Sequence, residues 1–384
     1  MEPSGRNPWQ LPLYSAGTEP RGARVTLHTE TESGGRLLHV EHELRRLVRA
    51  GLPGAFVFIE DADGSSQFLT AGWADLEGKT RMTPESHYRV GSTTKTFTAV
   101  VALQLVSEGR FALDDTLGEL LPDIGVPAAD RMTIEHLLRM RSGLFDFEDD
   151  PSLLGNLDAH RVPISLERAV ELGIRHPLLF EPGARFSYCN TNFCLLEMVV
   201  ERVSGQGLGQ AMRQRIIEPL GLPGTHYPPE AQLVLPEPFI RGYERKRDGW
   251  EECSEVFFGR GDGALISTAV DLAMFFRALL VEGRLLNAET LARMMAVLPD
   301  DPPAAEAYGL GLIADPLACG VVWGHGGGGF GYENLPYMRL ETRRFAVFML
   351  NGSYGYRASS VTPPGGRPRF SPRFRASVYC ETEH

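Results

Sequence analysis

The sequence has no run of about 18 apolar residues, the length that a membrane-spanning helix requires. We therefore expect no transmembrane helix and no membrane partner. Its N-terminal segment also has no basic start followed by a short apolar stretch, which is the pattern of a secretory signal. Because this pattern is missing, we expect the protein to work in the cytoplasm.

Cysteine is also scarce, with five in 384 residues. An odd number without zinc-like spacing predicts neither a disulfide framework nor a metal site. We interpret all five as reduced thiols of a cytoplasmic protein, and we expect no metal and no other cofactor. They are Cys189, Cys194, Cys253, Cys319 and Cys380.

Basic residues are too few to balance the acidic ones: 38 Lys and Arg stand against 49 Asp and Glu, a formal net charge of -11. This charge argues against a nucleic-acid partner. The hydrophobic fraction of 43% and the charged fraction of 23% are those of an ordinary globular protein. Such a length allows two or three domains, or one large fold with an insertion, and the oligomeric state is not indicated.

Strand-like patterns are present at both ends of the chain. The segments AFVFIEDADG and QFLTAGWADL predict two strands joined by a turn at Asp63-Gly64, after a helical pattern from Leu38 to Val48. Three more strand-like segments follow position 308, namely GVVWGH, YENLPYMRLE and RFAVFMLNG. The region between is mostly helical. This order predicts one antiparallel sheet assembled from both termini, with an inserted helical block.

The same patterns divide the chain into units. The segment after Ser353 is rich in Pro, Gly and Arg, and we expect it not to form an ordinary amphipathic helix. The expected units are an irregular lead-in (1–36), a folded domain (37–352) with an α/β part (37–110 and 305–352) and a helical part (111–304), and a tail (353–384).

The stretch YRVGSTTKTFTAV places Ser92 at the start of an apolar helix and Lys95 one turn later. Side chains three apart share a helical face, and a helix N-terminus favours negative charge. A lysine desolvated there can take the proton of the serine, so the pair is a candidate nucleophile with its base. A serine cap beside a solvated lysine explains the same spacing, so the pair alone does not establish this chemistry.

The segment RFSYCNTNF contains Tyr188 and Asn190, which face the same side of an extended chain. A tyrosine near a lysine can share a proton, and an asparagine can hold a carbonyl or amide of a substrate. A packed aromatic ring and a capping asparagine are the structural alternative.

The segment WGHGGGGFGY contains His325 and four glycines, Gly326 to Gly329, that let a ligand approach the backbone. A backbone N–H here can donate to a developing oxyanion. The segment also fits G-x-G-x-x-G, but a strand-like pattern follows it and no βαβ unit is present, so we reject a dinucleotide site. A glycine-rich turn with a solvated histidine is the structural alternative.

Together, in this order, the three segments resemble the motifs of the penicillin-recognising serine enzymes. Ser92-Thr93-Thr94-Lys95, Tyr188-Cys189-Asn190 and His325-Gly326-Gly327 match S-x-x-K, Y-x-N and [KH]-x-G. The serine DD-carboxypeptidases, class C β-lactamases and related esterases are the most similar branch, and the resemblance covers about Leu38 to Gly352. It implies an α/β (α+β) β-lactamase/transpeptidase-like fold, with the antiparallel sheet flanked by helices.

The resemblance also implies an acyl-enzyme mechanism. Ser92 would attack an ester or amide carbonyl while Lys95 and Tyr188 move protons. The substrate-binding residues would be Asn190, His325, Gly326, Gly327 and Gly328, with the N–H groups of Ser92 and Gly328 as the oxyanion hole.

Two departures bear on the fate of the acyl group. The carboxypeptidases place a basic residue after GLGL to hold the substrate carboxylate, whereas Ile313, Ala314 and Asp315 stand here. The family usually closes with a helix on the sheet, which we do not expect from this tail. Water as acceptor would make the protein an esterase, amidase, DD-carboxypeptidase or β-lactamase, and an amine would make it a transacylase. A ligand-binding sensor is a third class, against which the intact motifs argue.

Among these alternatives, we expect a cytoplasmic biosynthetic transacylase that forms an amide from an ester without ATP, similar to relatives in antibiotic biosynthesis. Its partners would be a small-molecule acyl donor and an amine acceptor. The acceptor pocket would lie beside Ser92 and be lined by residues such as Phe145, Phe147 and Trp250.

Overall fold

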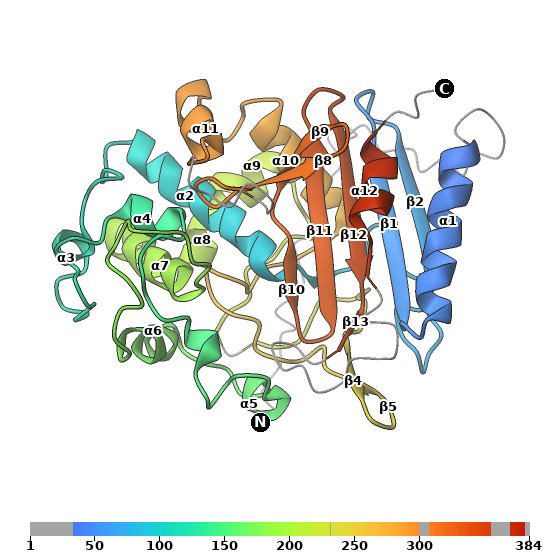
Figure 1. Cartoon of the computed structure of the whole chain (residues 1–384), viewed down its shortest axis with the longest axis horizontal. Helices are drawn as coiled ribbons and strands as arrows, with labels where there is room; N and C mark the ends of the chain where they lie inside the picture. Colours follow the sequence, from blue (N-terminus) through green and yellow to red (C-terminus); the bar gives the residue numbers. More distant parts are fainter. Residues whose placement is uncertain (1–33, 231, 299–306, 355–368, 381–384) are drawn as a thin grey trace, which may run out of the picture.

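The structure is a computed structural model that describes residues 34–230, 232–298, 307–354 and 369–380. Its main sheet is antiparallel and takes strands from both ends of the described chain, as predicted (Figure 1). The strand order is β2-β1-β12-β11-β9-β8-β7, and β10 pairs with β11. The strands are β1 (Gly54–Glu60), β2 (Ser66–Gly72), β7 (Ala307–Tyr308), β8 (Ile313–Leu317), β9 (Gly320–Gly324), β10 (Gly327–Gly329), β11 (Tyr332–Arg339) and β12 (Arg344–Leu350).

The first two strands form the predicted hairpin. Asp61 N–H donates to the carbonyl of Ser65 across the turn, and the Asp63 carboxylate accepts from both the N–H and the hydroxyl of Ser65. β1 lies between β2 and β12 and is buried on both faces, which explains its nearly continuous apolar sequence.

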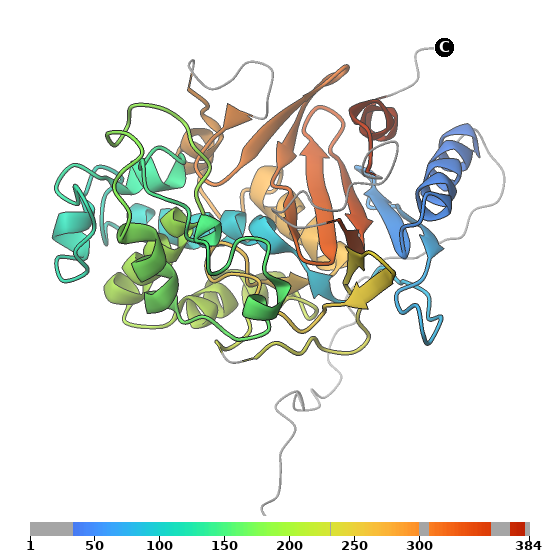
Figure 2. The same ribbon diagram turned by 60° about the horizontal axis from the view of Figure 1, so that its bottom comes forward.

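Helices cover both faces of this sheet (Figure 2). Phe345 of β12 contacts Phe276 of α10 (Ala269–Leu280), whereas Phe348 contacts Phe374 of α12 (Pro372–Tyr379). Residues three apart in a strand point to opposite faces, so α10 and α12 lie on opposite sides of the sheet. α1 (Gly34–Arg49) lies beside α12 on the outer side.

The expectation that the tail supplies no closing helix is therefore wrong. Ser371 caps α12 by accepting from the N–H of Phe374, and Pro372 occupies the first turn, where its missing N–H costs nothing. Phe370, Phe374 and Val378 are buried at helical spacing, an apolar stripe that is hard to recognise among the arginines.

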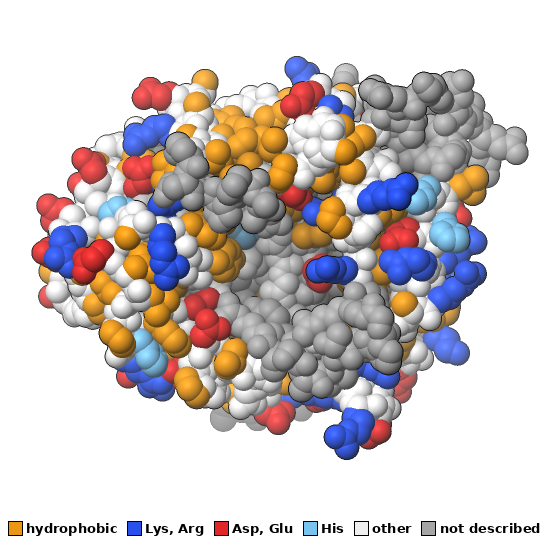
Figure 3. Space-filling model, viewed as in Figure 1, with side chains coloured by type: hydrophobic (Ala, Val, Ile, Leu, Met, Phe, Trp, Pro, Cys, Tyr) orange, Lys and Arg blue, Asp and Glu red, His pale blue; other side chains and the backbone are white. Residues whose placement is uncertain are grey.

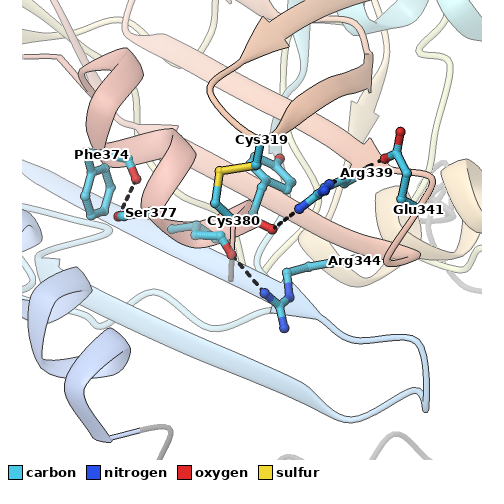
Figure 4. The surroundings of a disulfide bond; sticks show 9 residues. Cys319, Arg339, Glu341, Arg344, Phe374, Ser377 and Cys380 are labelled. Carbon is cyan, nitrogen blue, oxygen red and sulfur yellow. Dashed lines mark hydrogen bonds and ion pairs between the residues drawn. A yellow bond between two sulfur atoms is a disulfide. The ribbon is translucent and has the colours of Figure 1, made fainter. Parts of the chain in front are cut away.

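A disulfide joins Cys380, which follows α12, to Cys319 in the turn between β8 and β9 (Figure 4). The interpretation of all five cysteines as reduced thiols is thus wrong for this pair, which is 61 positions apart. Spacing could not reveal it because the two residues meet only once the tail has folded back onto the sheet. Cys189, Cys194 and Cys253 are free and buried.

The inserted part is mostly helical and surrounds α2, which is buried along nearly its whole length (Figure 1). Thr133 and Thr268 each cap the helix that follows them through a side-chain hydrogen bond, and Gly205, in a left-handed conformation, ends another. The helices are α2 (Thr94–Ser107), α3 (Leu117–Leu120), α4 (Ile134–Leu138), α5 (Leu157–His160), α6 (Leu166–Ile174), α7 (Thr191–Ser204), α8 (Leu208–Met212), α9 (Glu218–Leu220) and α11 (Ala288–Met295). The remaining helical segments are the 3₁₀ turns η1 (Gly91–Thr93) and η2 (Phe147–Asp149) and the π-helical segment η3 (Arg213–Ile217), which connects α8 to α9.

Two small sheets in this region were not predicted. The hairpin of β4 (Tyr243–Lys246) and β5 (Gly249–Glu252) pairs in parallel with β13 (Gly352–Ser353), and β3 (Tyr88–Arg89) pairs with β6 (Ile266–Ser267). These strands have two to four residues each, too short to give a recognisable alternation in the sequence.

The expected lead-in lies outside the described residues apart from 34–36, which open α1.

On the face in Figure 3, side chains of both charge signs are interspersed over the helical part at the left, and basic ones gather over α1 at the right. Within the described ranges, every helix is too short or too polar to traverse a bilayer.

Candidate active site

Ser92 lies in η1, at the N-terminal end of the buried helix α2. The residue before it, Gly91, has a φ of 53°, a left-handed conformation that favours glycine. A Cβ on Gly91 would lie only 2.8 Å from the backbone N of Gly328. A glycine is therefore needed to bring the glycine-rich strand β10 against Ser92.

Lys95 is fully buried, and its Nζ has three neighbours. It lies 3.0 Å from Oγ of Ser92, 2.7 Å from Oδ1 of Asn190 and 2.7 Å from the carbonyl oxygen of Asp262. The last two oxygens are acceptors only, so each takes an N–H of the amine. These two contacts leave the remaining position of the Lys95 amine directed at the Ser92 hydroxyl, which is the arrangement that proton transfer requires.

Asn190 connects the first two motifs. Its Nδ2 donates to Oδ2 of Asp146, at 3.0 Å, which turns Oδ1 toward Lys95. Asn190 immediately precedes α7 and is buried, so the helix fixes the position of its backbone.

Tyr188 lies on the same side of the site as Lys95, whose Nζ is 5.0 Å from the centre of the tyrosine ring. Tyr188 as a whole residue is 36% exposed, yet desolvation raises the pKa of its phenol, and Lys95 and Ser92 act on that pKa in the opposite direction. The structure therefore brings Ser92, Lys95, Tyr188 and Asn190 together, as we expected from the first two sequence motifs.

The glycines of the third motif have different surroundings. A Cβ on Gly327 would lie 1.8 Å from the carbonyl oxygen of Val90, and one on Gly329 would collide with the ring of Phe258. Gly328 faces the space beside Ser92, and the N–H of Gly326 donates to the hydroxyl of Tyr337. Gly326 and Gly327 thus hold β10 in place, while Gly328 lies next to the candidate nucleophile.

His325 is buried behind this strand. Its Nε2 lies 2.9 Å from the Tyr308 hydroxyl and its Nδ1 lies 2.6 Å from the carbonyl oxygen of Gly326. Burial, with a smaller contribution from the charge of Lys95, lowers the pKa of His325 to about 3, so the imidazole is neutral at ordinary pH. Both ring nitrogens are engaged, and the ring centre is 6.3 Å from that of Tyr188. His325 supports the wall of the site rather than lining the pocket at Ser92.

The pocket at Ser92 is formed by residues from several separate segments of the chain. Sequence reasoning missed most of its lining because these residues come from loops without a regular pattern, such as FDFEDD and FFGRGDG. The lining residues are Gly91, Ser92, Glu148, His160, Asn190, Phe257, Phe258, Asp262, Gly263, Gly328, Gly329 and Phe330.

The aromatic residues expected beside Ser92 lie elsewhere. Trp250 packs on Tyr354 and donates to the carbonyl of Gly51, Phe147 is fully buried in the core, and Phe145 stacks on His176. The expected lining by Phe145, Phe147 and Trp250 is thus wrong, and Phe257, Phe258 and Phe330 supply the rings instead.

Two further side chains that bear on the proposed chemistry are engaged in contacts of their own. Cys189, the other possible nucleophile of the second motif, is buried, which raises the pKa of its thiol, and its Sγ faces the carbonyl of Phe145. Asp315, one of the three residues that follow GLGL, forms an ion pair with Arg375 of α12. No group of three or more His, Cys, Asp or Glu in the described part of the chain is arranged to hold a metal ion.

Curated relatives resemble this chain at 25–27% identity. The D-aminopeptidase of Brucella anthropi is 27% identical over 281 residues, which are 73% of this chain and 52% of the relative. Penicillin-binding protein 4* of Bacillus subtilis is 25% identical over 73% of this chain and 64% of its own length. The chain thus spans about half to two thirds of these two relatives.

Solved structures cover more of the fold. A D-stereospecific amidohydrolase from a Streptomyces species superposes with a TM-score of 0.75 at 34% identity, covering 82% of this chain and 94% of that one. The D-amino acid amidase of Ochrobactrum anthropi SV3, solved with L-phenylalanine, gives a TM-score of 0.75 at 26% identity, over 84% and 94% of the two chains.

The family model described as "Beta-lactamase" matches residues 40–363, which include all three motifs. That match agrees with the antiparallel sheet from both termini and with the cluster around Ser92. This chain belongs to the beta-lactamase family, whose members are serine acyl-enzyme hydrolases.

Proposed function

We propose that this protein is a serine amidohydrolase that forms an acyl-enzyme at Ser92 with esters or amides of D-amino acids. Lys95 takes the proton of Ser92, Tyr188 delivers a proton to the leaving group, and the N–H groups of Ser92 and Gly328 receive the oxyanion. The observation that carries the substrate class is a carboxylate: the buried Glu148 lines the same pocket as Ser92.

A buried carboxylate next to an acyl-enzyme recognises a cation on the acyl donor. The cation nearest to the carbonyl of an amino-acid amide is its α-ammonium group, so Glu148 favours aminoacyl donors with a free amine. The rings of Phe257, Phe258 and Phe330 line the pocket as well and fit an apolar side chain. The D configuration is taken from the names of the D-aminopeptidase, D-amidase and D-stereospecific amidohydrolase relatives.

A donor panel tests this proposal. Ammonia release from D-phenylalanine amide, L-phenylalanine amide and N-acetyl-D-phenylalanine amide is measured for the wild type and for Glu148→Gln. The wild type should prefer the free D-amide, and Glu148→Gln should lose this preference while keeping turnover of the N-acetyl compound. Equal turnover of the acetylated and free amides by the wild type would contradict the role of Glu148. Preference for a peptide ending in D-Ala-D-Ala would replace the proposal by a carboxypeptidase.

Transfer of the acyl group to an amine, as in the biosynthetic transacylase expected from the sequence, is a second candidate. The three phenylalanine rings give part of the pocket wall beside Ser92 an apolar surface that an amine acceptor with an apolar body can contact. A bound amine then competes with water at about 55 M through effective molarities of about 10⁵–10⁸ M. Product analysis with a D-amino acid ester, with and without added amines, distinguishes amide from free acid, and the absence of amide with every amine would exclude transfer.

The cytoplasmic setting stays a prediction. The disulfide Cys319–Cys380 weighs against it, because disulfides persist chiefly in oxidising compartments. Source cells are treated with a reagent that adds mass to free thiols and are then fractionated. Immunoblotting of the fractions shows which compartment holds the protein, and the mass shift reports whether Cys319 and Cys380 are joined.

A further inference from the structure

The third neighbour of Lys95 is a backbone atom, the carbonyl oxygen of Asp262. Its position depends on what holds the loop from Gly259 to Gly263. The N–H of Gly261 in this loop donates to Oε2 of Glu197 at 2.6 Å. On the other side, the carbonyl of Gly261 accepts from the hydroxyl of Thr98 in α2, also at 2.6 Å. The peptide beside Asp262 is therefore held between α7 and α2.

Glu197 is an unusual residue to find inside a helical core, since its exposed fraction is only 1%. Its Oε1 accepts from the hydroxyl of Tyr227 at 2.7 Å and lies 3.6 Å from Nη2 of Arg260. These partners compensate for the loss of water around the carboxylate. Both oxygens are thus engaged, one with the loop and the other with side chains that pack over it.

The position of Glu197 on α7 connects it to the active site. Asn190 immediately precedes the first residue of α7, and Glu197 follows seven residues later, which is about two helical turns. Both residues therefore lie on the same side of the helix. Asn190 contacts Lys95 directly, whereas Glu197 reaches it through Gly261 and Asp262. One helix thereby controls both acceptors that orient the amine of Lys95.

We propose that Glu197 is a positioning residue for acylation: it fixes the Gly261–Asp262 segment so that the carbonyl of Asp262 occupies one N–H of Lys95 and the lone pair of the amine points at Ser92. This inference rests on the proposed function, in which Ser92 is the nucleophile. Removal of the carboxylate leaves the N–H of Gly261 without its acceptor, and the loop shifts. A shift of the order of 1 Å at a catalytic group costs about 100-fold in rate.

The ionisation of Glu197 provides a second test of the proposal, through the pH dependence of the acylation rate. Burial raises the pKa of Glu197 to about 7, against the opposing effects of Arg260, Tyr227 and the N–H of Gly261, and nearby Glu201 adds to the rise. Glu197 therefore gains its negative charge near neutral pH and becomes a stronger acceptor above it. The acylation rate should rise with this ionisation, and a neutral isostere should remove that component of the pH profile.

The experiment uses the full chain and a chromogenic ester of D-phenylalanine, with the acylation rate taken from the pre-steady-state burst and the Ser92 adduct confirmed by mass spectrometry. The variants are Glu197→Ala, Glu197→Gln and the matched control Glu201→Gln. Glu201 lies one turn further along α7 and accepts from the N–H of Leu208 instead of the loop. Melting temperatures are measured for all of them.

Glu197→Ala should acylate about 10- to 100-fold more slowly with a nearly unchanged KM. Glu197→Gln, which can still accept from Gly261, should recover most of the rate but lose the component of the pH profile near 7. Glu201→Gln should acylate at the wild-type rate at high pH, with the component near pH 7 kept but moved to slightly lower pH, because the charge of Glu201 raises the pKa of Glu197. A wild-type acylation rate in a folded Glu197→Ala variant would overturn the inference, and so would a pH profile of Glu197→Gln identical to that of the wild type.

The design separates the two proposals. Labelling that persists in Ser92→Ala would disprove the nucleophile assignment whatever the Glu197 variants do. Labelling confined to Ser92, but indifferent to position 197, would disprove only the positioning role. If Glu197→Ala fails to fold, the rate and pH profile of Glu197→Gln decide the question.

Discussion

Nζ of Lys95 lies 2.7 Å from Oδ1 of Asn190, a residue 95 positions later in the chain. This contact joins the first two motifs into one hydrogen-bonded cluster. With the carbonyl of Asp262 as its other acceptor, the amine of Lys95 has the hydroxyl of Ser92 3.0 Å away for proton exchange. This geometry allows the serine and the lysine to act as a unit.

Ser92→Ala should abolish acylation, to below about a thousandth of the wild-type rate, and leave the melting temperature almost unchanged. Lys95→Ala should lose a similar factor but should also melt earlier, because it leaves Asn190 and Asp262 without their buried donor. Adduct formation with an activated ester, followed by intact-protein mass spectrometry, measures the first effect, and thermal denaturation measures the second. Residual turnover of several per cent in Ser92→Ala would assign the nucleophile elsewhere.

Cys189→Ser provides the matched control, since this residue lies in the second motif. Its thiol is buried and its Sγ donates to the carbonyl of Phe145, a bond that a serine hydroxyl can keep. Acylation by this variant should stay within about twofold of the wild type. Loss of the Ser92 adduct after a thiol reagent modifies Cys189 would argue for a thiol-dependent mechanism.

Gly327→Ala and Gly328→Ala should differ sharply in stability. A Cβ at position 327 would lie 1.8 Å from the carbonyl of Val90, whereas one at 328 has nothing nearer than the carbonyl of Tyr332 at 3.4 Å. The first substitution forces β10 away from η1 and should cost about 1–3 kcal/mol of unfolding free energy, with loss of acylation. Chemical denaturation of both variants tests this, and equal stability of the two would contradict the packing described here.

Removal of the disulfide by Cys319→Ser and Cys380→Ser should lower the unfolding free energy by up to about 4 kcal/mol, because the bond closes a long loop. The acylation rate at low temperature should persist, since α12 contributes nothing to the pocket lining. Melting curves with and without a reductant make the comparison. The reductant should destabilise the wild type and leave the double variant unaffected; no effect on the wild type would show that the bond contributes little.

Acid should destabilise the protein through His325. Burial lowers the pKa of this residue to about 3, so below about 6.5 the unfolded chain binds a proton that the folded protein excludes. This contribution to stability is complete above about pH 6.5 and is lost as the pH falls toward 3, at about 1.4 kcal/mol per pH unit. His325→Gln should flatten the decline measured by urea unfolding between pH 6.5 and 4. His226, whose pKa burial lowers to about 4, is present in both proteins, so its own contribution to the decline cancels when the two are compared.

Much of the fold could be predicted because its signals are local. The alternation and apolar runs of β1, β2, β9, β11 and β12 and the caps at Thr133 and Thr268 lie within a few residues of the elements that they define. The spacing of Ser92 and Lys95 is local too, as one helical turn brings them together. Three such short patterns in a fixed order were enough to indicate the family and the cluster at Ser92.

Contacts between distant parts of the chain were decided only by the tertiary structure. Asp262 contributes a carbonyl oxygen that every residue has, so no side-chain pattern marks it. Glu148 and the phenylalanines of the pocket come from irregular loops, and Cys319 meets Cys380 only after α12 has packed on the sheet. The sequence by itself determined the local elements and indicated the candidate residues for the chemistry, because helical periodicity and turn residues act over short distances. Folding decided what surrounds them, because burial and long-range hydrogen bonds depend on every element that packs against the site.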